Sequence, residues 1–124
     1  MTTGVLTAPA ETGVREAAER LVAEGVGSLV VVDKTGRPMG LFTNTDLAAF
    51  VAEGAATDAT VGEYATEEMI TVATGSSIRE AAARMIRQGV HHLPVTDEEG
   101  EVVGMLSTMD LAAHFSYTGG TDMI

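Results

Sequence analysis

Apolar residues recur at helical spacing in two stretches of the chain. In the first stretch the apolar positions are Val14, Ala17, Ala18, Leu21 and Val22, at i, i+3, i+4, i+7 and i+8. The second stretch, from Ile78 to Ile86, repeats that spacing. A period near 3.6 residues puts such side chains on one face of a helix. Gly25 and Gly89 follow the two stretches, where a left-handed residue commonly ends a helix.

Short apolar runs around these helices predict strands. One run precedes each helix, at Val5–Ala8 and at Met69–Val72. Two runs follow each helix, at Ser28–Asp33 and Met39–Thr43, then at His92–Asp97 and Val102–Ser107. The turns between them, Asp33-Lys34-Thr35-Gly36 and Asp97-Glu98-Glu99-Gly100, are typical of hairpins. A further helix is predicted over Thr45–Glu53 and again over Met109–Phe115.

The second half of the chain is a copy of the first. Residues 14–50 align with residues 78–114 without a gap, and 16 of the 37 pairs are identical. Each copy reads β-α-β-β-α, and three strands are too few to close a core alone. We therefore predict a mixed α/β (α+β) fold in which two such repeats pack sheet to sheet with pseudo-two-fold symmetry. We expect repeat 1 with its linker over residues 1–60, repeat 2 over 61–115 with a short helical turn at Val61–Tyr64, and a mobile tail over 116–124.

Composition narrows the function classes. The chain of 124 residues has 18 acidic and seven basic residues, so it offers no basic face for nucleic acid or for an anionic membrane surface. It has no cysteine, which excludes disulfides, thiolate metal sites and cysteine nucleophiles. No apolar run approaches the ~20 residues of a membrane span, and the first residues show no signal-peptide pattern. We expect a cytoplasmic protein with neither nucleic acid nor membrane as a partner.

Two motifs occur once in each copy. Copy 2 contains Gly89-Val90-His91-His92-Leu93-Pro94-Val95-Thr96-Asp97 and Gly104-Met105-Leu106-Ser107-Thr108-Met109-Asp110-Leu111. Copy 1 contains Gly25-Val26-Gly27-Ser28-Leu29-Val30-Val31-Val32-Asp33 and Gly40-Leu41-Phe42-Thr43-Asn44-Thr45-Asp46-Leu47. Together with the duplication, these motifs resemble a tandem pair of cystathionine β-synthase (CBS) domains, the Bateman module, over about residues 5–115.

The resemblance implies a regulatory module that binds an adenosine-containing ligand in clefts between the repeats. It implies that the Asp of one repeat binds the ribose hydroxyls and that the Ser or Thr three residues before it faces the phosphate. The first strand and the Gly-Val segment of the other repeat would enclose the base and supply basic groups. One implied cleft comprises Thr43, Thr45, Asp46, Met69, Ile70, Val90, His91 and His92. The other comprises Val5, Leu6, Val26, Gly27, Ser28, Ser107, Met109 and Asp110.

The Ser/Thr-x-x-Asp motifs also have a purely structural interpretation. A hydroxyl beside a helix N-terminus lies where free N–H groups favour an anion, and a carboxylate one turn on suits two vicinal ribose hydroxyls. The same spacing is that of an N-cap residue with a capping-box acid. The duplication favours ligand binding by Asp46 and Asp110, and both roles can hold together.

His91 and His92 admit three interpretations. They can be ordinary surface or edge-strand residues, phosphate-facing groups, or metal ligands. Adjacent strand residues point to opposite faces, which disfavours a shared metal ion. Next to a phosphate the histidines would become protonated, and binding would tighten at mildly acid pH.

The two implied clefts differ in charge. Copy 1 has Gly27 and Ser28 where copy 2 has its two histidines. We therefore expect the cleft at Asp46 to take a ligand with one phosphate, for which AMP is the leading candidate. We expect the cleft at Asp110 to be empty or to hold a phosphate-free adenosyl group.

No motif in the sequence indicates an enzyme or an obligatory cofactor. The chain lacks a P-loop, a Gly-x-Ser-x-Gly elbow and a pair of catalytic carboxylates. The preferred hypothesis is a stand-alone sensor of an adenosyl ligand that forms a homodimer through its helices and signals to an unknown effector protein. The alternative is a ligand-free structural dimerisation module, in which the Ser/Thr-x-x-Asp motifs are only helix caps.

Overall fold

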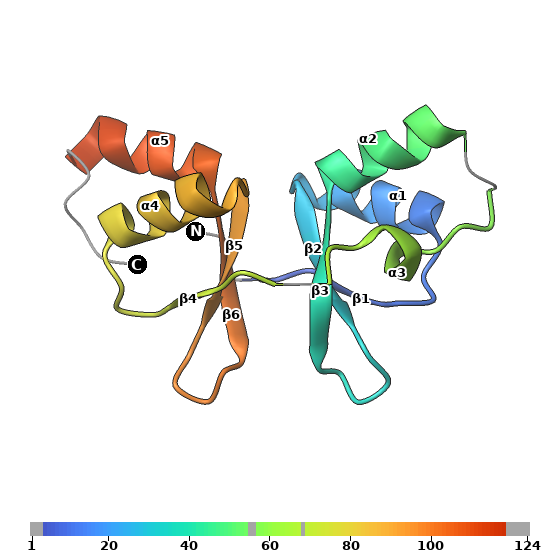
Figure 1. Ribbon diagram of the computed structural model, residues 1–124, viewed down its shortest axis with the longest axis horizontal. Helices are drawn as coiled ribbons and strands as arrows, with labels where there is room; N and C mark the ends of the chain where they lie inside the picture. The colour runs from blue at the N-terminus through green and yellow to red at the C-terminus, as the bar shows by residue number, and fades with distance from the viewer. Residues whose placement is uncertain (1–3, 55–56, 68, 119–124) are drawn as a thin grey trace. The chain divides into compact units, whose positions relative to one another are not determined.

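Two units make up the structure, a computed structural model that describes residues 4–54, 57–67 and 69–118 (Figure 1). Contacts between Cα atoms define a first unit over Leu6–Met69. The second unit joins the residues before Leu6 to those from Ile70 onward. Leu6 and Ile70 are equivalent positions of the two copies, so the chain is divided at the same point of each repeat.

The first unit is a three-stranded sheet with its helices on one side. Strands β1 (Thr7–Pro9), β2 (Ser28–Val32) and β3 (Pro38–Thr43) lie in that order. Strands β1 and β2 run parallel, which requires the crossover helix α1 (Val14–Glu24), whereas β2 and β3 form an antiparallel hairpin. Helix α2 (Asn44–Glu53) follows β3 directly and lies on the same side of the sheet as α1 (Figure 1).

The core of the first unit lies between the sheet and α1. Strand residues alternate between the two faces of a sheet, and Leu29, Val31 and Phe42 point into this core with at most 1% of their surface exposed. The predicted apolar face of α1 covers them: its buried residues are Val14, Ala17 and Leu21. The helical spacing therefore identifies these three buried residues correctly, whereas Val22, which the same spacing places on that face, is exposed.

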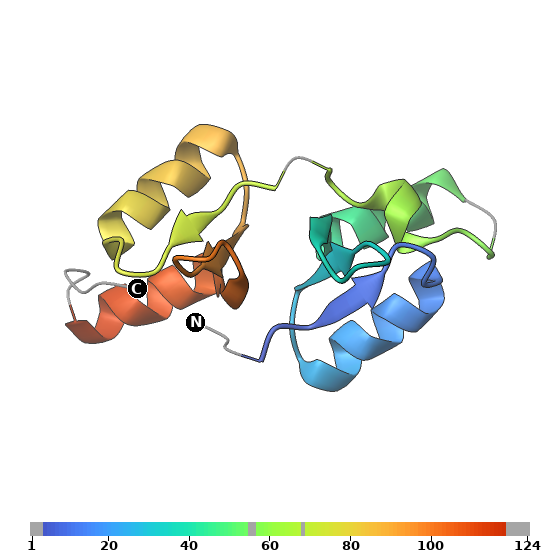
Figure 2. The same cartoon turned by 90° about the horizontal axis from the view of Figure 1, so that it is seen from below.

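The second unit repeats this plan. Strands β4 (Val72–Ala73), β5 (His92–Thr96) and β6 (Val102–Ser107) form a sheet in that order, with β4 parallel to β5 and β5 antiparallel to β6. Helix α4 (Ile78–Gln88) crosses between β4 and β5, and α5 (Thr108–Thr118) follows β6. Figure 2 shows α4 and α5 from below. The core consists of Val72, Ala81, Met85, Leu93, Val95 and Leu106.

The predicted helix ends are confirmed. Gly25 and Gly89 both have a φ of 66°, in the left-handed region, and each donates its N–H to carbonyls of the last turn of α1 or α4. At the start of α4 the Ser77 hydroxyl accepts the N–H of Glu80 at 3.0 Å. Gly13, at the start of α1, has no side chain that could do the same.

A short helix, α3 (Val61–Tyr64), packs on the first unit. Val61 is fully buried in the core of that unit, and the ring of Tyr64 meets the ring of Phe50 edge to face at 5.6 Å between centroids. The helical turn predicted here is confirmed. The sequence boundary that we place at residue 61 differs from the packing boundary, which lies after Met69.

The segment after α3 lies along the free edge of β3. Thr66 and Leu41 form an antiparallel bridge, with N–H to carbonyl distances of 2.8 and 3.1 Å. Next to this bridge, Gly40 comes so close to Thr66 that a Cβ atom on Gly40 would overlap the Thr66 carbonyl. Glycine at position 40 is therefore a packing requirement of the first unit.

Some predicted ends shift. Strand β1 begins at Thr7 rather than Val5, and β4 begins at Val72 rather than Met69, because the register with the neighbouring strand starts at these residues. Helix α5 continues to Thr118, three residues beyond the predicted end at Phe115. Residues 119–124 of the predicted tail, and residues 55–56 of the linker, lie outside the described residues. No helix in the described ranges is long and apolar enough to cross a membrane.

Candidate functional site

Each hairpin leads into a helix whose first turn is capped by the Ser/Thr-x-x-Asp motif. In the first unit, Oδ2 of Asp46 accepts the N–H of Thr43 at 2.8 Å and its hydroxyl at 3.2 Å. In the second unit, Oδ2 of Asp110 accepts the N–H of Ser107 at 2.8 Å and its hydroxyl at 3.1 Å. The predicted capping by both motifs is confirmed, and we call them the Asp46 corner (residues 43–46) and the Asp110 corner (residues 107–110).

The cap uses only one carboxylate oxygen of Asp46. Both bonds from Thr43 reach Oδ2, and Oδ1 has no hydrogen bond to any described residue. Burial raises the pKa of Asp46, while the N–H and hydroxyl of Thr43 lower it and partly offset that effect. A half-buried carboxylate with one oxygen left open can accept the hydroxyls of a sugar while it still caps the helix.

The Gly-Val segment of the first unit lies beside the Asp46 corner. Asn44 donates its N–H to the Gly27 carbonyl at 3.0 Å, and Ser28 pairs with Thr43 across the hairpin. Ser28 is 5% exposed, so a larger side chain has little room there. The side chains beside the Asp46 corner in the first unit are therefore small and uncharged.

The equivalent segment of the second unit carries the two histidines. Thr108 donates its N–H to the His91 carbonyl at 3.1 Å, and His92 pairs with Ser107 across the hairpin. Burial lowers the pKa of His92, the nearby His91 lowers it further, and the Asp110 carboxylate raises it. His92 therefore lies close enough to the corner of its own repeat for the Asp110 carboxylate to favour its protonated form. Within the described residues no three His, Asp or Glu side chains are grouped as a metal site would need.

The predicted cleft residues are divided between the units. The first unit holds Thr43, Thr45, Asp46 and Met69 of one cleft, and Leu6, Val26, Gly27 and Ser28 of the other. The second unit holds Ile70, Val90, His91 and His92 of the former, and Val5, Ser107, Met109 and Asp110 of the latter. Met69 thus falls in the same unit as Asp46, and Val5 in the same unit as Asp110. The assembly of each cleft from residues of both units stays a prediction.

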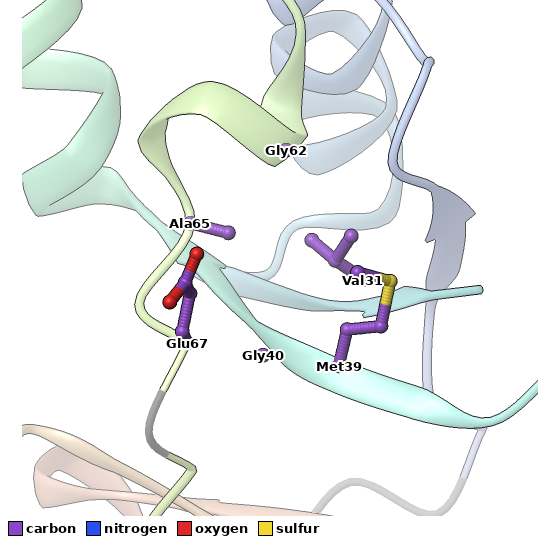
Figure 3. A pocket seen from close by; sticks show the side chains of 6 residues that line it. All are labelled: Val31, Met39, Gly40, Gly62, Ala65 and Glu67. Carbon is purple, nitrogen blue, oxygen red and sulfur yellow. The ribbon is translucent and has the colours of Figure 1, made fainter.

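A pocket of about 280 Å³ opens between α3 and β3 of the first unit (Figure 3). Its lining residues are Val31, Met39, Gly40, Gly62, Ala65 and Glu67. None of them was predicted as a site residue, because the pocket exists only where the four-residue α3 packs against the sheet. Its lining is apolar apart from the Glu67 carboxylate, so it offers no group that would bind a phosphate.

Comparison with known proteins identifies the fold. The CBS domain matches residues 1–53 and 61–117 of this chain. A curated relative, an uncharacterized protein of Methanopyrus kandleri, is 30% identical over 105 residues, which cover 83% of this chain and 53% of the relative. The chain therefore spans about half the length of that protein.

Two similar solved structures contain adenosyl ligands. The CBS domain pair of protein MJ0100, in complex with 5′-methylthioadenosine and S-adenosyl-L-methionine, is 26% identical; the match covers 94% of this chain and 91% of that chain with a TM-score of 0.85. The CBS domain protein PAE2072 from Pyrobaculum aerophilum, complexed with AMP, is 28% identical; the match covers 90% of each chain with a TM-score of 0.80. Both copies of the repeat match the CBS domain, and this chain belongs to the CBS domain family.

Proposed function

We propose that this protein is a regulatory module that binds an AMP-like ligand at the Asp46 corner and passes the bound state to a partner protein. The observation that carries the proposal is the half-buried Asp46 carboxylate, which caps α2 through Oδ2 and leaves Oδ1 open. Two similar CBS structures that contain AMP, or 5′-methylthioadenosine and S-adenosyl-L-methionine, support the choice of ligand class. No catalytic step is part of this proposal.

The predicted residues have distinct roles in this proposal. Asp46 accepts the two ribose hydroxyls, and Thr43 at the N-terminus of α2 faces the phosphate. Met69, Ile70 and Val90 enclose the base. Thr45, His91 and His92 complete the phosphate end of the ligand. His92 takes up a proton as the phosphate binds, because a nearby anion raises the pKa that burial lowers in the free protein.

The Asp110 corner takes a different ligand or none. The residues proposed to face it from the first unit, Gly27 and Ser28, bring no positive charge, and Ser28 is buried. A phosphate that faced Gly27 and Ser28 would lack the charge-assisted hydrogen bonds that a basic residue provides. A phosphate-free adenosyl group, such as that of methylthioadenosine, suits this corner better.

We further propose that the protein acts in the cytoplasm as a homodimer built from its helices. Val22 on α1 and Ile86 on α4 are equivalent positions, and they are 82% and 81% exposed. Exposed alanine pairs on α2 and α5, at residues 48–49 and 112–113, would allow close helix approach. Light scattering on the intact protein and on a Val22→Glu/Ile86→Glu variant tests this, with a dimer expected for the former and a monomer for the latter.

A thermal-shift screen tests the ligand. A ligand that binds only the folded state stabilises it by about 2.7 kcal/mol at 100 times its dissociation constant, so AMP should raise the midpoint of unfolding. ADP and ATP should raise it less, because the proposed site takes one phosphate. Methylthioadenosine and S-adenosylmethionine test the Asp110 corner. If no ligand raises the midpoint and Asp46→Ala changes nothing, the rival function remains, a ligand-free structural module whose motifs are only caps.

A further inference from the structure

Two arginines, one in each copy, make the same long-range hydrogen bond. In the first unit Nη1 of Arg20 donates to the Thr7 carbonyl at 2.7 Å. In the second unit Nη1 of Arg84 donates to the Thr71 carbonyl at 2.6 Å. Arg84 and Thr71 are the repeat equivalents of Arg20 and Thr7. The acceptor in both copies is a backbone carbonyl, so the bond fixes the path of the chain.

The accepting carbonyl lies on the free edge of the sheet. The Leu6 carbonyl accepts the N–H of Val30 at 2.9 Å, so Leu6 faces β2. Successive residues of a strand turn their N–H and C=O groups to opposite edges, and Thr7 therefore faces away from β2. Among the described residues no strand pairs with that edge of β1, and the Arg20 guanidinium takes the place of a neighbouring strand.

Each arginine thus holds the point at which the chain enters the sheet. Thr7 follows Leu6 directly, and Thr71 follows Ile70 directly. Strand β4 has only two residues, Val72–Ala73, so few backbone bonds hold the chain there without the arginine. The entry segments are the ones that we propose to contact the adenine base.

We infer that Arg20 and Arg84 are positioning residues, each of which holds one base-contacting segment in place for one ligand. Arg84 holds Met69–Ile70 for the ligand at Asp46, and Arg20 holds Val5–Leu6 for the ligand at Asp110. This inference rests on the proposed function. A charged donor to a backbone carbonyl is a stronger restraint than a neutral one, and the planar guanidinium loses less freedom than an ammonium when it forms such a bond.

The substitution Arg84→Met tests the inference, because it keeps the aliphatic stem and removes the donor. The dissociation constant for AMP should rise about tenfold, the equivalent of one lost charge-assisted hydrogen bond. Arg79→Met on the same helix is the matched control, since Arg79 is exposed and makes no described hydrogen bond. Arg20→Met should leave AMP affinity within about twofold of the unsubstituted protein, because Arg20 holds Val5–Leu6 and not Met69–Ile70. Arg84→Lys should recover part of the loss.

The hydrogen-exchange rates of backbone amides test the same restraint without a ligand. Amides of residues 71–74 should exchange faster in Arg84→Met than in Arg79→Met, with no matching change at residues 7–10. Lower thermal stability in Arg84→Met with AMP affinity and exchange equal to those of Arg79→Met would overturn the inference. If the unsubstituted protein binds none of AMP, methylthioadenosine and S-adenosylmethionine, the proposed function fails. In that case, equal exchange in the two variants also overturns the arginine restraint. Faster exchange in Arg84→Met would instead show that Arg84 holds the strand for folding alone, which overturns its role in ligand binding.

Discussion

The two repeats share a fold and differ at one side of the corner where a ligand would bind. Both have the same strand order, the same capped corner and the same arginine bond. Beside that corner the first unit has Gly27 and the buried Ser28, whereas the second has the exposed His91 and the half-buried His92. Duplication has kept the parts that fold the chain, and the charge next to the corner has diverged.

A second difference concerns the segment that packs on the sheet of the first unit. Helix α3 and the segment up to Thr66 add Val61 to the core of the first unit and pair with the free edge of β3. This packing depends on Gly40, which approaches the Thr66 carbonyl. The first unit therefore has a stability requirement that the repeat pattern alone does not show.

The substitution Gly40→Ala should disrupt the packing of the segment around Thr66 on β3 and have the largest effect on stability. The new Cβ would overlap the Thr66 carbonyl, a backbone atom that can move only with its segment. We expect the free energy of unfolding to fall by about 3 kcal/mol, at the upper end for overpacking. Urea unfolding measures it. Gly13→Ala is the control, because a Cβ there meets no atom within 4 Å; equal losses in the two variants would contradict the packing described for Gly40.

The substitution Asp46→Asn separates the ligand role of the corner from its capping role. Asparagine keeps an oxygen that can accept the Thr43 N–H, but it loses the charge that binds ribose hydroxyls. We expect AMP affinity to fall about thirtyfold, the equivalent of about 2 kcal/mol. Calorimetric titration measures this. Asp110→Asn is the matched control and should leave AMP affinity nearly unchanged; an equal loss in both would remove the assignment of AMP to the Asp46 corner.

The stability of the unsubstituted protein should respond to the titration of Asp46 in a defined direction. Burial raises the pKa of Asp46 above 3.8, so the folded protein binds more protons than the unfolded chain between 3.8 and the raised value. The contribution of Asp46 to stability therefore declines as pH rises through that window, and the asparagine variant lacks this decline. Urea unfolding between pH 3.5 and 7 compares the two proteins, and parallel curves would show that Asp46 is not the group concerned.

The double substitution His91→Gly/His92→Ser makes the second unit resemble the first at this position. AMP affinity should fall about tenfold, because the phosphate loses its charge-assisted partners, and adenosine affinity should not change. Competition binding with both ligands measures the difference. A fall of the same size for adenosine would mean that the histidines support the fold or the base rather than the phosphate.

A pH titration should show the smallest effect, a severalfold change. Burial keeps the pKa of His92 below 6.5 in the free protein, and a bound phosphate raises it. The complex then holds more protons than the free protein between those two values, so AMP affinity rises as pH falls from the raised value towards the lower one. Adenosine is the control and should bind equally across this range. A flat profile for AMP would exclude proton uptake by His92.

Most of the fold could be predicted from the sequence because the same pattern of apolar and turn residues occurs in both repeats. The helical spacing of Val14–Val22 recurs in the second repeat, and a glycine follows it in each. Both repeats therefore predict the same position and the same end for this helix. The packing of α3 could not be predicted, because four residues are too short for a helical period and nothing local says which sheet they cover. The arginine bonds escaped prediction for a related reason: the acceptor is a backbone carbonyl 13 residues away, which no side-chain pattern marks.

The number of AMP molecules bound per chain tests the central claim most directly, that two similar corners have different ligands. Isothermal titration calorimetry of the intact protein at pH 7 measures it. The expected result is a stoichiometry of about one AMP per chain, at a site that Asp46→Asn weakens and Asp110→Asn leaves nearly unchanged. Two equal AMP sites per chain, or one site that disappears in Asp110→Asn alone, would contradict it.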